Sequence, residues 1–292
     1  MIWQDYKKLY ANGLKQYSPK FKKELQNQVN TYCRTLDYNA ISDKAIKKTI
    51  QKLHLAMGVK MAQISSKVVK RSVKGHYEAL EVKSAETDLF AYTILQYLQT
   101  QGLDQLASDI TNTTKEQIRR YLIQSAEQNL TLPESIVLLR GAGITDYRAE
   151  LIARTETGRA ANIGSMVGAT STGLVTIKEW IAAKDNRTRR IPRDQFDHLN
   201  MDGTKIPMDA TFKLQNKKGG FDLMLHPCDS SGSAGDVCNC RCTLGYEAQR
   251  DKNGKLLKLE NNPPKGNVGM IWGILTNAVG MQIGRLIADL FE

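Results

Sequence analysis

The residues best suited to chemistry lie between Ile181 and Cys242. Four of the five cysteines fall in this stretch, in the pattern C-x9-C-x-C-x-C, together with two of the four histidines. Zinc takes about four ligands from thiolate, imidazole or carboxylate groups. The pattern therefore predicts one structural metal ion in this region, with zinc as the candidate. The predicted ligands are His198, Cys240 and Cys242, with the fourth taken from Cys238, Cys228 or His226.

Two other interpretations of this stretch stay open. In the first, Cys240 and Cys242 are half-buried small hydrophobic residues, and His198 is only a hydrogen-bonding group. In the second, the charged side chains form an acid–base or metal-hydrolase site, as in a metal-dependent nuclease that acts on DNA. The residues of that site would be Asp185, Arg187, His198, Asp202 and His226. The chain contains no nucleophile motif, phosphate-binding loop or dinucleotide fingerprint, so we expect no catalysis.

A second group of polar residues lies just upstream, in the segment R-T-E-T-G-R-A-A-N (154–162). At about 100° per residue, Thr155, Arg159 and Asn162 fall on one helical stripe, with Arg154 and Glu156 on either side. Such a face either pins a neighbouring element or holds an anionic ligand, and we favour the structural role. The predicted structural polar motif consists of Arg154, Glu156, Arg159, Asn162, Asp185 and Arg187.

The charge of the chain is concentrated near its start. The formal net charge is +11 over 292 residues, yet residues 1–75 alone hold sixteen Lys and Arg against four acidic residues. Such a region favours binding to DNA without sequence preference or to an acidic protein surface. A solvated, lysine-rich helix face is the alternative. The predicted contact residues are Lys44, Lys47, Lys48, Lys52, Lys67, Lys70, Arg71 and Lys74.

The cysteine usage indicates a reducing compartment. The number of cysteines is odd, and Cys238, Cys240 and Cys242 are spaced two apart, which places neighbours poorly for bridging one another. The first residues lack the apolar stretch of a secretory signal peptide, so we expect no export signal.

The elements that must position these residues are helical in the first half of the chain. Residues 44–64 place six apolar side chains at steps of three and four, with lysines opposite, which predicts an amphipathic helix. Thr113 and Glu116 have the spacing of a capping box that opens another helix. Pro133 begins a short helix. Thr145 is predicted to cap the helix that carries the polar segment.

The second half predicts a smaller region of mixed structure. Residues 173–183 alternate in polarity and are rich in β-branched side chains, which is typical of a strand. Glycine, proline and serine then recur and leave room only for short strands. The predicted fold class is therefore α+β, with a mainly α-helical N-terminal half and a small, loop-rich α+β C-terminal domain.

The C-terminal tail follows a linker at 261–266. Glycines at 269, 273, 280 and 284 form two G-x-x-x-G pairs on an apolar helix, and small residues at that spacing let helices approach closely. Polar residues interrupt the apolar run, so docking on a helix partner is favoured and membrane interaction is the alternative. The predicted parts of the chain are a basic helical arm (1–80), a helical region (81–143), an α+β domain (144–250), and a linker with the apolar Gly-spaced helix (251–292).

The order of the motifs resembles the phage Mu F-like family of minor head, or head morphogenesis, proteins over about residues 110–250. The shared pieces are R-T-E-x2-R-x2-N, W-x4-D-x-R-x-R, D-G after a histidine, H-P-x-D and N-C-R-C. Relatives usually carry Gly where Cys228 stands, and Cys238 is not a cysteine of the family, whereas the position of His198 can be Cys. The resemblance therefore favours His198, Cys240 and Cys242 as the ligands, within a Mu F-like domain at 144–250.

The resemblance implies a minor head protein of a tailed phage or prophage, at the portal vertex inside the capsid, involved in DNA packaging or ejection. The implied partners are the phage portal protein, other head proteins and DNA bound non-specifically. The implied location is the virion interior, and the host cytoplasm during assembly. The alternatives are a metal-dependent nuclease and an ejected virion protein that interacts with a membrane through its tail.

Overall fold

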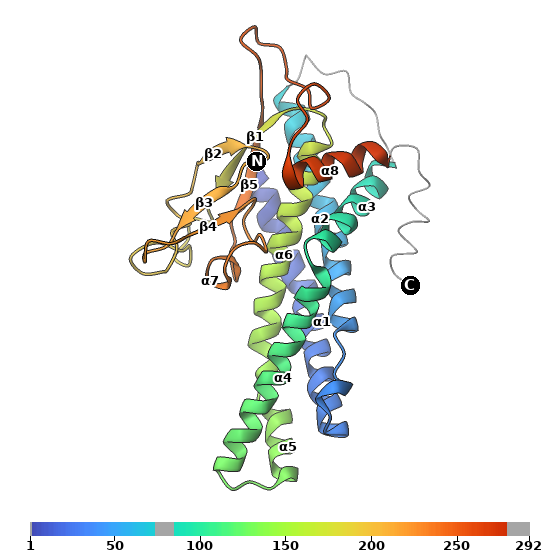
Figure 1. The fold of residues 1–292 in the computed structure, drawn as a ribbon, viewed down its shortest axis with the longest axis vertical. Helices are drawn as coiled ribbons and strands as arrows, with labels where there is room; N and C mark the ends of the chain where they lie inside the picture. Colours follow the sequence, from blue (N-terminus) through green and yellow to red (C-terminus); the bar gives the residue numbers. More distant parts are fainter. Residues whose placement is uncertain (1, 74–84, 279–292) are drawn as a thin grey trace.

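The computed structural model describes residues 2–73 and 85–278, and it shows a long helical shaft with a small β region packed beside one end (Figure 1). The α+β prediction is confirmed. The helices are α1 (Ile2–Thr35), α2 (Lys44–Ser72), α3 (Ala85–Thr100), α4 (Leu103–Glu127), α5 (Leu132–Gly141), α6 (Ile144–Thr170), α7 (Ala234–Val237) and α8 (Gly266–Asn277), with a 3-10 turn η1 (Tyr38–Ala40) after α1.

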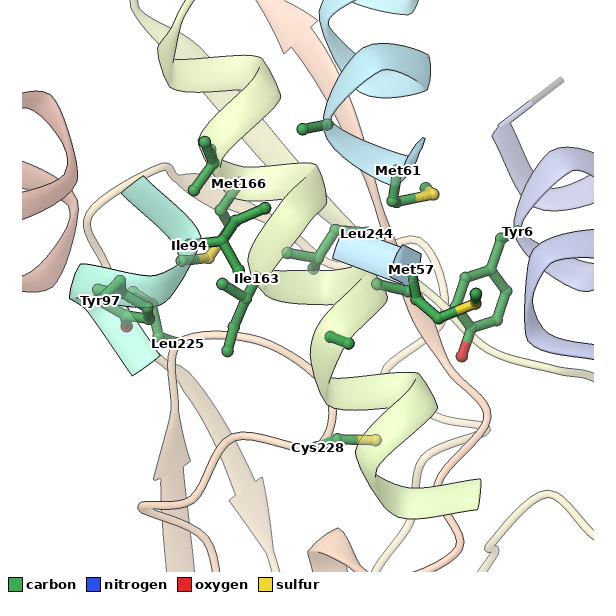
Figure 2. Close-up of a cluster of buried hydrophobic side chains, with 14 of the residues drawn as sticks. Tyr6, Met57, Met61, Ile94, Tyr97, Ile163, Met166, Leu225, Cys228 and Leu244 are labelled. Carbon is green, nitrogen blue, oxygen red and sulfur yellow. The ribbon is translucent and has the colours of Figure 1, made fainter. Parts of the chain in front are cut away.

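The central element is α6, which runs along both α1 and α2 (Figure 1). Its residues from 155 to 170 are all buried, because helices cover one side and the β region covers the other. The amphipathic stripe predicted at 44–64 is confirmed within α2, where its apolar side chains face this core. Figure 2 shows Tyr6, Met57, Ile94, Ile163 and Leu244, from five different elements, gathered around α6.

Two glycines let α2 and α6 approach closely. A Cβ on Gly164 would lie 2.0 Å from the Gly58 carbonyl oxygen, and a Cβ on Gly168 would lie 2.0 Å from that of Ala62. Residues four apart lie on the same face of a helix, so the pair forms one flat strip along the contact. The sequence prediction assigned small-residue packing to the tail, and the strip inside α6 was missed.

Two of the predicted helix starts are wrong. Thr113 lies inside α4, where its hydroxyl donates to the Asp109 carbonyl oxygen, and no helix begins there. Thr145 lies inside the first turn of α6, whose N-cap is Gly143. The short helix α5 is confirmed, and its capping box is formed by Thr131 together with Glu134.

The β region consists of two small antiparallel sheets. The first has the order β2-β1-β5, and its central strand β1 confirms the strand predicted at 173–183. The second is the hairpin of β3 and β4. The strands are β1 (Thr176–Ile181), β2 (Lys205–Pro207), β3 (Phe212–Gln215), β4 (Phe221–Met224) and β5 (Thr243–Ala248).

The main buried core is continuous from α1 through the strands to α8. The first part of the tail is the helix α8, which packs on α3 and α6 and has an open face at Gly273. Residues 279–292 and Lys74 lie outside the described residues, so the second G-x-x-x-G pair is not placed. Within the described ranges, every helix is too short or too polar to cross a bilayer.

Candidate metal centre

The structure brings His198, Cys240 and Cys242 together in a buried cluster. The Nδ1 atom of His198 lies 3.4 Å from the sulfur of Cys240 and 3.7 Å from that of Cys242. Tetrahedral zinc with Zn–N and Zn–S bonds of about 2.0 and 2.3 Å separates a nitrogen from a sulfur ligand by about 3.6 Å. The three ligand atoms lie within 4.8 Å of one another. The spacing therefore fits a zinc ion without rearrangement of the chain.

Each of the three residues is held by the fold of the β region. His198 belongs to the long connection between β1 and β2, and its backbone N–H donates to the Arg189 carbonyl oxygen. Its ring meets the edge of Trp180, on β1, at a centroid distance of 5.5 Å. Cys242 directly precedes β5, which pairs along the full length of β1. The β1–β5 pairing thus carries the N-C-R-C segment to the histidine.

An aspartate contacts the ring nitrogen of His198 that faces away from the two cysteines. The Nε2 atom of His198 pairs with Asp236, from the short helix α7, and the Asp236 side chain is fully buried. A carboxylate on the far nitrogen of a metal-ligating histidine fixes its tautomer and orientation. Sequence reasoning missed Asp236, although an acidic residue four positions before Cys240 in a ligand-rich segment is a usable signal.

The electrostatics of the cluster favour a charged pair. Burial lowers the pKa of His198, but the Cys240 sulfur and the Asp236 carboxylate outweigh it and raise the pKa to about 9. Thiol hydrogen bonds from Cys228 and Cys242, together with His198, hold the pKa of Cys240 well below its usual range. A deprotonated sulfur is the form that binds metals. Without a metal, this describes a thiolate beside an imidazolium, and a bound cation would have to displace the protons of His198 and of Cys242, whose pKa is raised by its hydrogen bond with Cys240.

The other predicted ligands lie in different surroundings. His226 is buried, and its Nδ1 atom lies 2.9 Å from the Pro227 carbonyl oxygen. Cys238 is partly exposed and offers its carbonyl to Arg189. Neither residue belongs to the three-residue cluster.

Two side chains of the polar segment on α6, Arg159 and Asn162, bind the backbone of the loops around Cys228 and Cys242. We call these two residues the clamp. Arg159 Nε donates to the Cys228 carbonyl oxygen at 2.9 Å. Asn162 Nδ2 donates to the Pro227 and Cys242 carbonyl oxygens at 3.0 and 3.2 Å. These backbone groups are buried, so each needs such a partner. Arg154 takes no part, because its partly exposed side chain pairs with Glu150.

Glu156 connects this clamp to the helical shaft. One of its carboxylate oxygens lies 2.6 Å from Arg159 Nη1, and the other lies 3.2 Å from Nε2 of His54 on α2. All three side chains are buried. Burial lowers the pKa of His54, so its contact with Glu156 is a buried hydrogen bond, which joins residues 102 positions apart.

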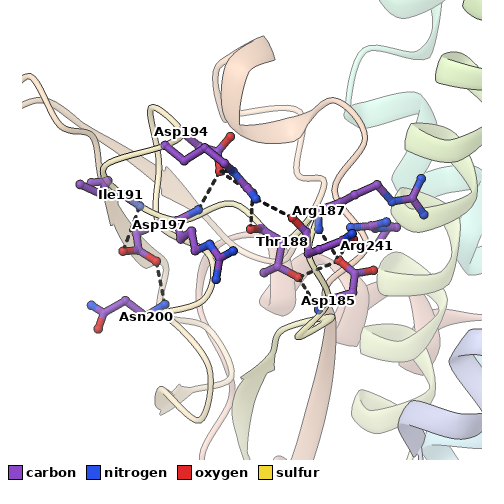
Figure 3. A network of polar contacts seen from close by, with 11 residues as sticks. Asp185, Arg187, Thr188, Ile191, Asp194, Asp197, Asn200 and Arg241 are labelled. Carbon is purple, nitrogen blue, oxygen red and sulfur yellow. Dashed lines mark hydrogen bonds and ion pairs between the residues drawn. The ribbon is translucent and has the colours of Figure 1, made fainter.

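Asp185 links a surface loop to the N-C-R-C segment through hydrogen bonds (Figure 3). Its Oδ1 atom accepts hydrogen bonds from Arg241 Nη2 at 2.6 Å, from the Arg187 backbone N–H at 3.0 Å and from Thr188 Oγ1 at 3.2 Å. All three contacts are made within the protein and stabilise the loop. Arg187 contributes through its backbone N–H and not through its side chain.

A buried lysine completes the support of the loop at 225–229. Lys178 Nζ donates to the Leu225 carbonyl oxygen at 2.7 Å, and the Leu225 N–H donates to Asp229 Oδ2 at 2.6 Å. Burial lowers the pKa of Lys178 to about 7. Sequence reasoning missed Lys178, because a lysine in an alternating strand normally faces solvent.

Among the described residues, five of the seven predicted basic contacts on α2 are exposed. Lys44, Lys48, Lys52 and Lys67 are exposed, as is Arg71. Lys47 instead pairs with Asp104, and Lys70 pairs with Glu86.

Comparison with known families gives one match. The family model described as phage Mu protein F like protein matches residues 102–245, from the start of α4 into β5. No curated protein and no solved structure matches the chain significantly. The matched residues include the clamp on α6 and the whole His/Cys cluster.

Proposed function

We propose that this chain, whose residues 102–245 match the phage Mu F-like family, is a minor head protein located at the portal vertex inside the capsid. In this role it contacts the portal protein and other head proteins, and it influences DNA packaging or ejection. The family match by itself supports a phage head-related protein.

The observation that carries the proposal is that the polar residues of the matched region are buried and stabilise the fold. Arg159 and Asn162 are buried and bind backbone carbonyl groups, and Glu156 is buried between Arg159 and His54. A substrate site needs polar groups directed into an accessible cleft. The arrangement supports a rigid structural part and argues against the nuclease alternative.

The proposed contact with DNA rests on the exposed lysines of α2. Lys48, Lys52 and Lys67 are exposed, and within the described residues none of them forms an ion pair. Mobile lysines on a helix bind phosphates without base recognition and release counterions when they do. Packed DNA inside a capsid presents such phosphates at high density.

The proposed cofactor is one structural zinc ion bound by His198, Cys240 and Cys242. Their ligand spacing and the Asp236 carboxylate, which pairs with the other ring nitrogen of His198, support it. The expected result is about one zinc per reduced, folded chain by elemental analysis. A result well below one, under conditions where the thiols remain reduced, would remove the zinc from the proposal.

The head role is tested by quantitative mass spectrometry of gradient-purified particles from the phage that carries this chain. The chain is compared with the portal protein before and after DNA release. We expect a few copies per particle, and their loss on DNA release would assign the chain to the ejected class. Absence from filled particles would contradict the minor head role.

A further inference from the structure

We propose that a groove between α1 and α2, which we name the α1–α2 groove, seats one sugar-phosphate strand of duplex DNA. The groove has a volume of about 330 Å³, and its lining includes Lys8 from α1 and both Lys60 and Lys67 from α2. The inference rests on the DNA contact proposed above. It moves that contact from the face of one helix to a concave site, and it adds Lys8 and Lys60 to the residues involved.

The two helices run in opposite directions, which brings these lysines together from both walls. The Tyr17 hydroxyl donates to the Lys52 carbonyl oxygen at 2.9 Å, whereas the earlier residue Lys8 shares the groove with the later residues Lys60 and Lys67. Seven residues make about two helical turns, so Lys60 and Lys67 share one face of α2 and lie roughly 10 Å apart along the groove. The cations therefore follow the groove, as binding of an extended polyanion requires.

The charge of the α1–α2 groove is positive. Lys8, Lys60 and Lys67 are exposed, and in the described part of the chain none of them forms an ion pair. Asp5 is the one acidic residue in the described lining, so three cations share the groove with one carboxylate. Concave protein walls focus an electrostatic potential, and charges close to them are screened less than fully solvated charges. The groove is therefore expected to attract anions more strongly than a flat, lysine-bearing helix face.

The other lining residues suit a phosphodiester strand. Leu9 is buried and Ile64 is partly buried, and Asn12 adds an exposed amide that is able to donate hydrogen bonds. Lysine and asparagine contacts to phosphates position a duplex without reading its sequence. Duplex DNA carries one charge per about 1.7 Å of its axis, so several phosphates fall within the distance between Lys60 and Lys67.

The test measures binding of the full chain to short fluorescent duplexes of unrelated sequence, by anisotropy over a range of salt concentrations. The double variant Lys8→Gln with Lys60→Gln is expected to weaken binding at low salt. It is also expected to reduce the slope of log affinity against log salt by up to about 1.8, since each phosphate contact contributes about 0.9. The matched control, Lys217→Gln with Lys218→Gln, removes the same charge from exposed positions and is expected to keep the slope. Equal losses in both double variants would overturn the inference.

A further variant tests the groove through a gain in affinity. Asp5→Asn removes the carboxylate from the lining and is expected to tighten binding to the same duplexes about 2-fold to 5-fold at low salt, because repulsion of the phosphates is lost. Glu127→Gln makes the same change in charge at an exposed position in the last turn of α4. An equal gain in both variants would show that net charge, and not the groove, governs binding.

The groove and the proposed DNA contact fail in different ways. If Lys48→Gln with Lys52→Gln weakens binding while Lys8→Gln with Lys60→Gln does not, DNA binds α2 outside the groove, and only the inference is overturned. If the unaltered chain binds no duplex at low salt, the DNA contact itself is refuted. Binding of polyglutamate in place of the duplex would then assign the basic residues to an acidic protein partner.

Discussion

Glu156 joins the polar segment of α6 to the helical shaft through two buried contacts. It neutralises Arg159 and pairs with His54, so its loss leaves a buried guanidinium without a counter-charge. Removing one member of a buried ion pair costs about 3–5 kcal/mol. We therefore expect Glu156→Gln to lower the free energy of unfolding by that amount, measured by urea denaturation.

The matched control for this change lies six residues earlier on the same helix. Glu150 is half-exposed and pairs with Arg154 near the surface. Surface pairs contribute at most about 1 kcal/mol. If Glu150→Gln and Glu156→Gln lowered the free energy of unfolding equally, burial would not explain the importance of the pair between Glu156 and Arg159.

Lys178 gives the protein a pH-dependent stability. Its folded pKa of about 7 is lowered by burial, whereas an unfolded lysine titrates at about 10.4. Between these values the unfolded chain binds more protons, so the contribution of this lysine to stability rises with pH. From pH 7 to 9 we expect a rise of about 2 kcal/mol.

This prediction is checked by urea unfolding of the wild type and Lys178→Met across that range. The rise is expected to disappear in Lys178→Met and to persist in Lys218→Met, which changes an exposed lysine. The difference between the two variants isolates Lys178 from other groups that titrate in the same window. Parallel pH profiles for all three proteins would be incompatible with a buried, neutral lysine.

At the scale of elements, the contact between α2 and α6 depends on glycine. Because a Cβ on Gly164 or Gly168 would overlap a backbone carbonyl of α2, the helices must separate to accept it. Overpacking of this kind costs about 1–3 kcal/mol. We expect Gly164→Ala and Gly168→Ala to lower the melting temperature accordingly, as followed by circular dichroism.

The control is Gly273→Ala in α8, where a Cβ meets open space. Alanine is the better helix former, so this change is expected to be neutral or to stabilise by up to about 1 kcal/mol. Destabilisation by Gly273→Ala as large as that by Gly164→Ala would show that backbone freedom, rather than close approach, explains both.

At the scale of the whole molecule, the proposed contact with DNA depends on the exposed lysines of α2. Replacing Lys48, Lys52 and Lys67 together by Gln is expected to weaken DNA binding at low salt. It is also expected to reduce the slope of log affinity against log salt by up to about 3, since each phosphate contact contributes about 0.9. Fluorescence anisotropy with duplexes of unrelated sequence measures both quantities.

A charge-matched control is available in the hairpin of β3 and β4. Lys213, Lys217 and Lys218 are exposed there, and replacing them by Gln removes the same charge. If both triple variants weaken binding equally, net charge alone governs the interaction and α2 is no particular contact surface.

Several features could be predicted from the sequence because they depend on local pattern. The helix α2 followed from its apolar spacing, the strand β1 from its alternation, and the cluster of His198, Cys240 and Cys242 from the types of residue available. The false capping box at Thr113 shows the limit of this reasoning. The same four-residue spacing occurs at a helix start and inside a helix. Here Thr113 lies inside a helix, because α4 runs from Leu103 to Glu127.

Other features were decided only by the tertiary structure. Asp236 reaches His198 across 38 positions, His54 reaches Glu156 across 102, and the strip at Gly164 works only because Gly58 lies opposite. The chain itself determined which residues are able to bind a metal, fill a core or carry charge. Which of them meet depended on long-range packing, because burial makes a partner necessary and only the folded backbone determines which groups are within reach.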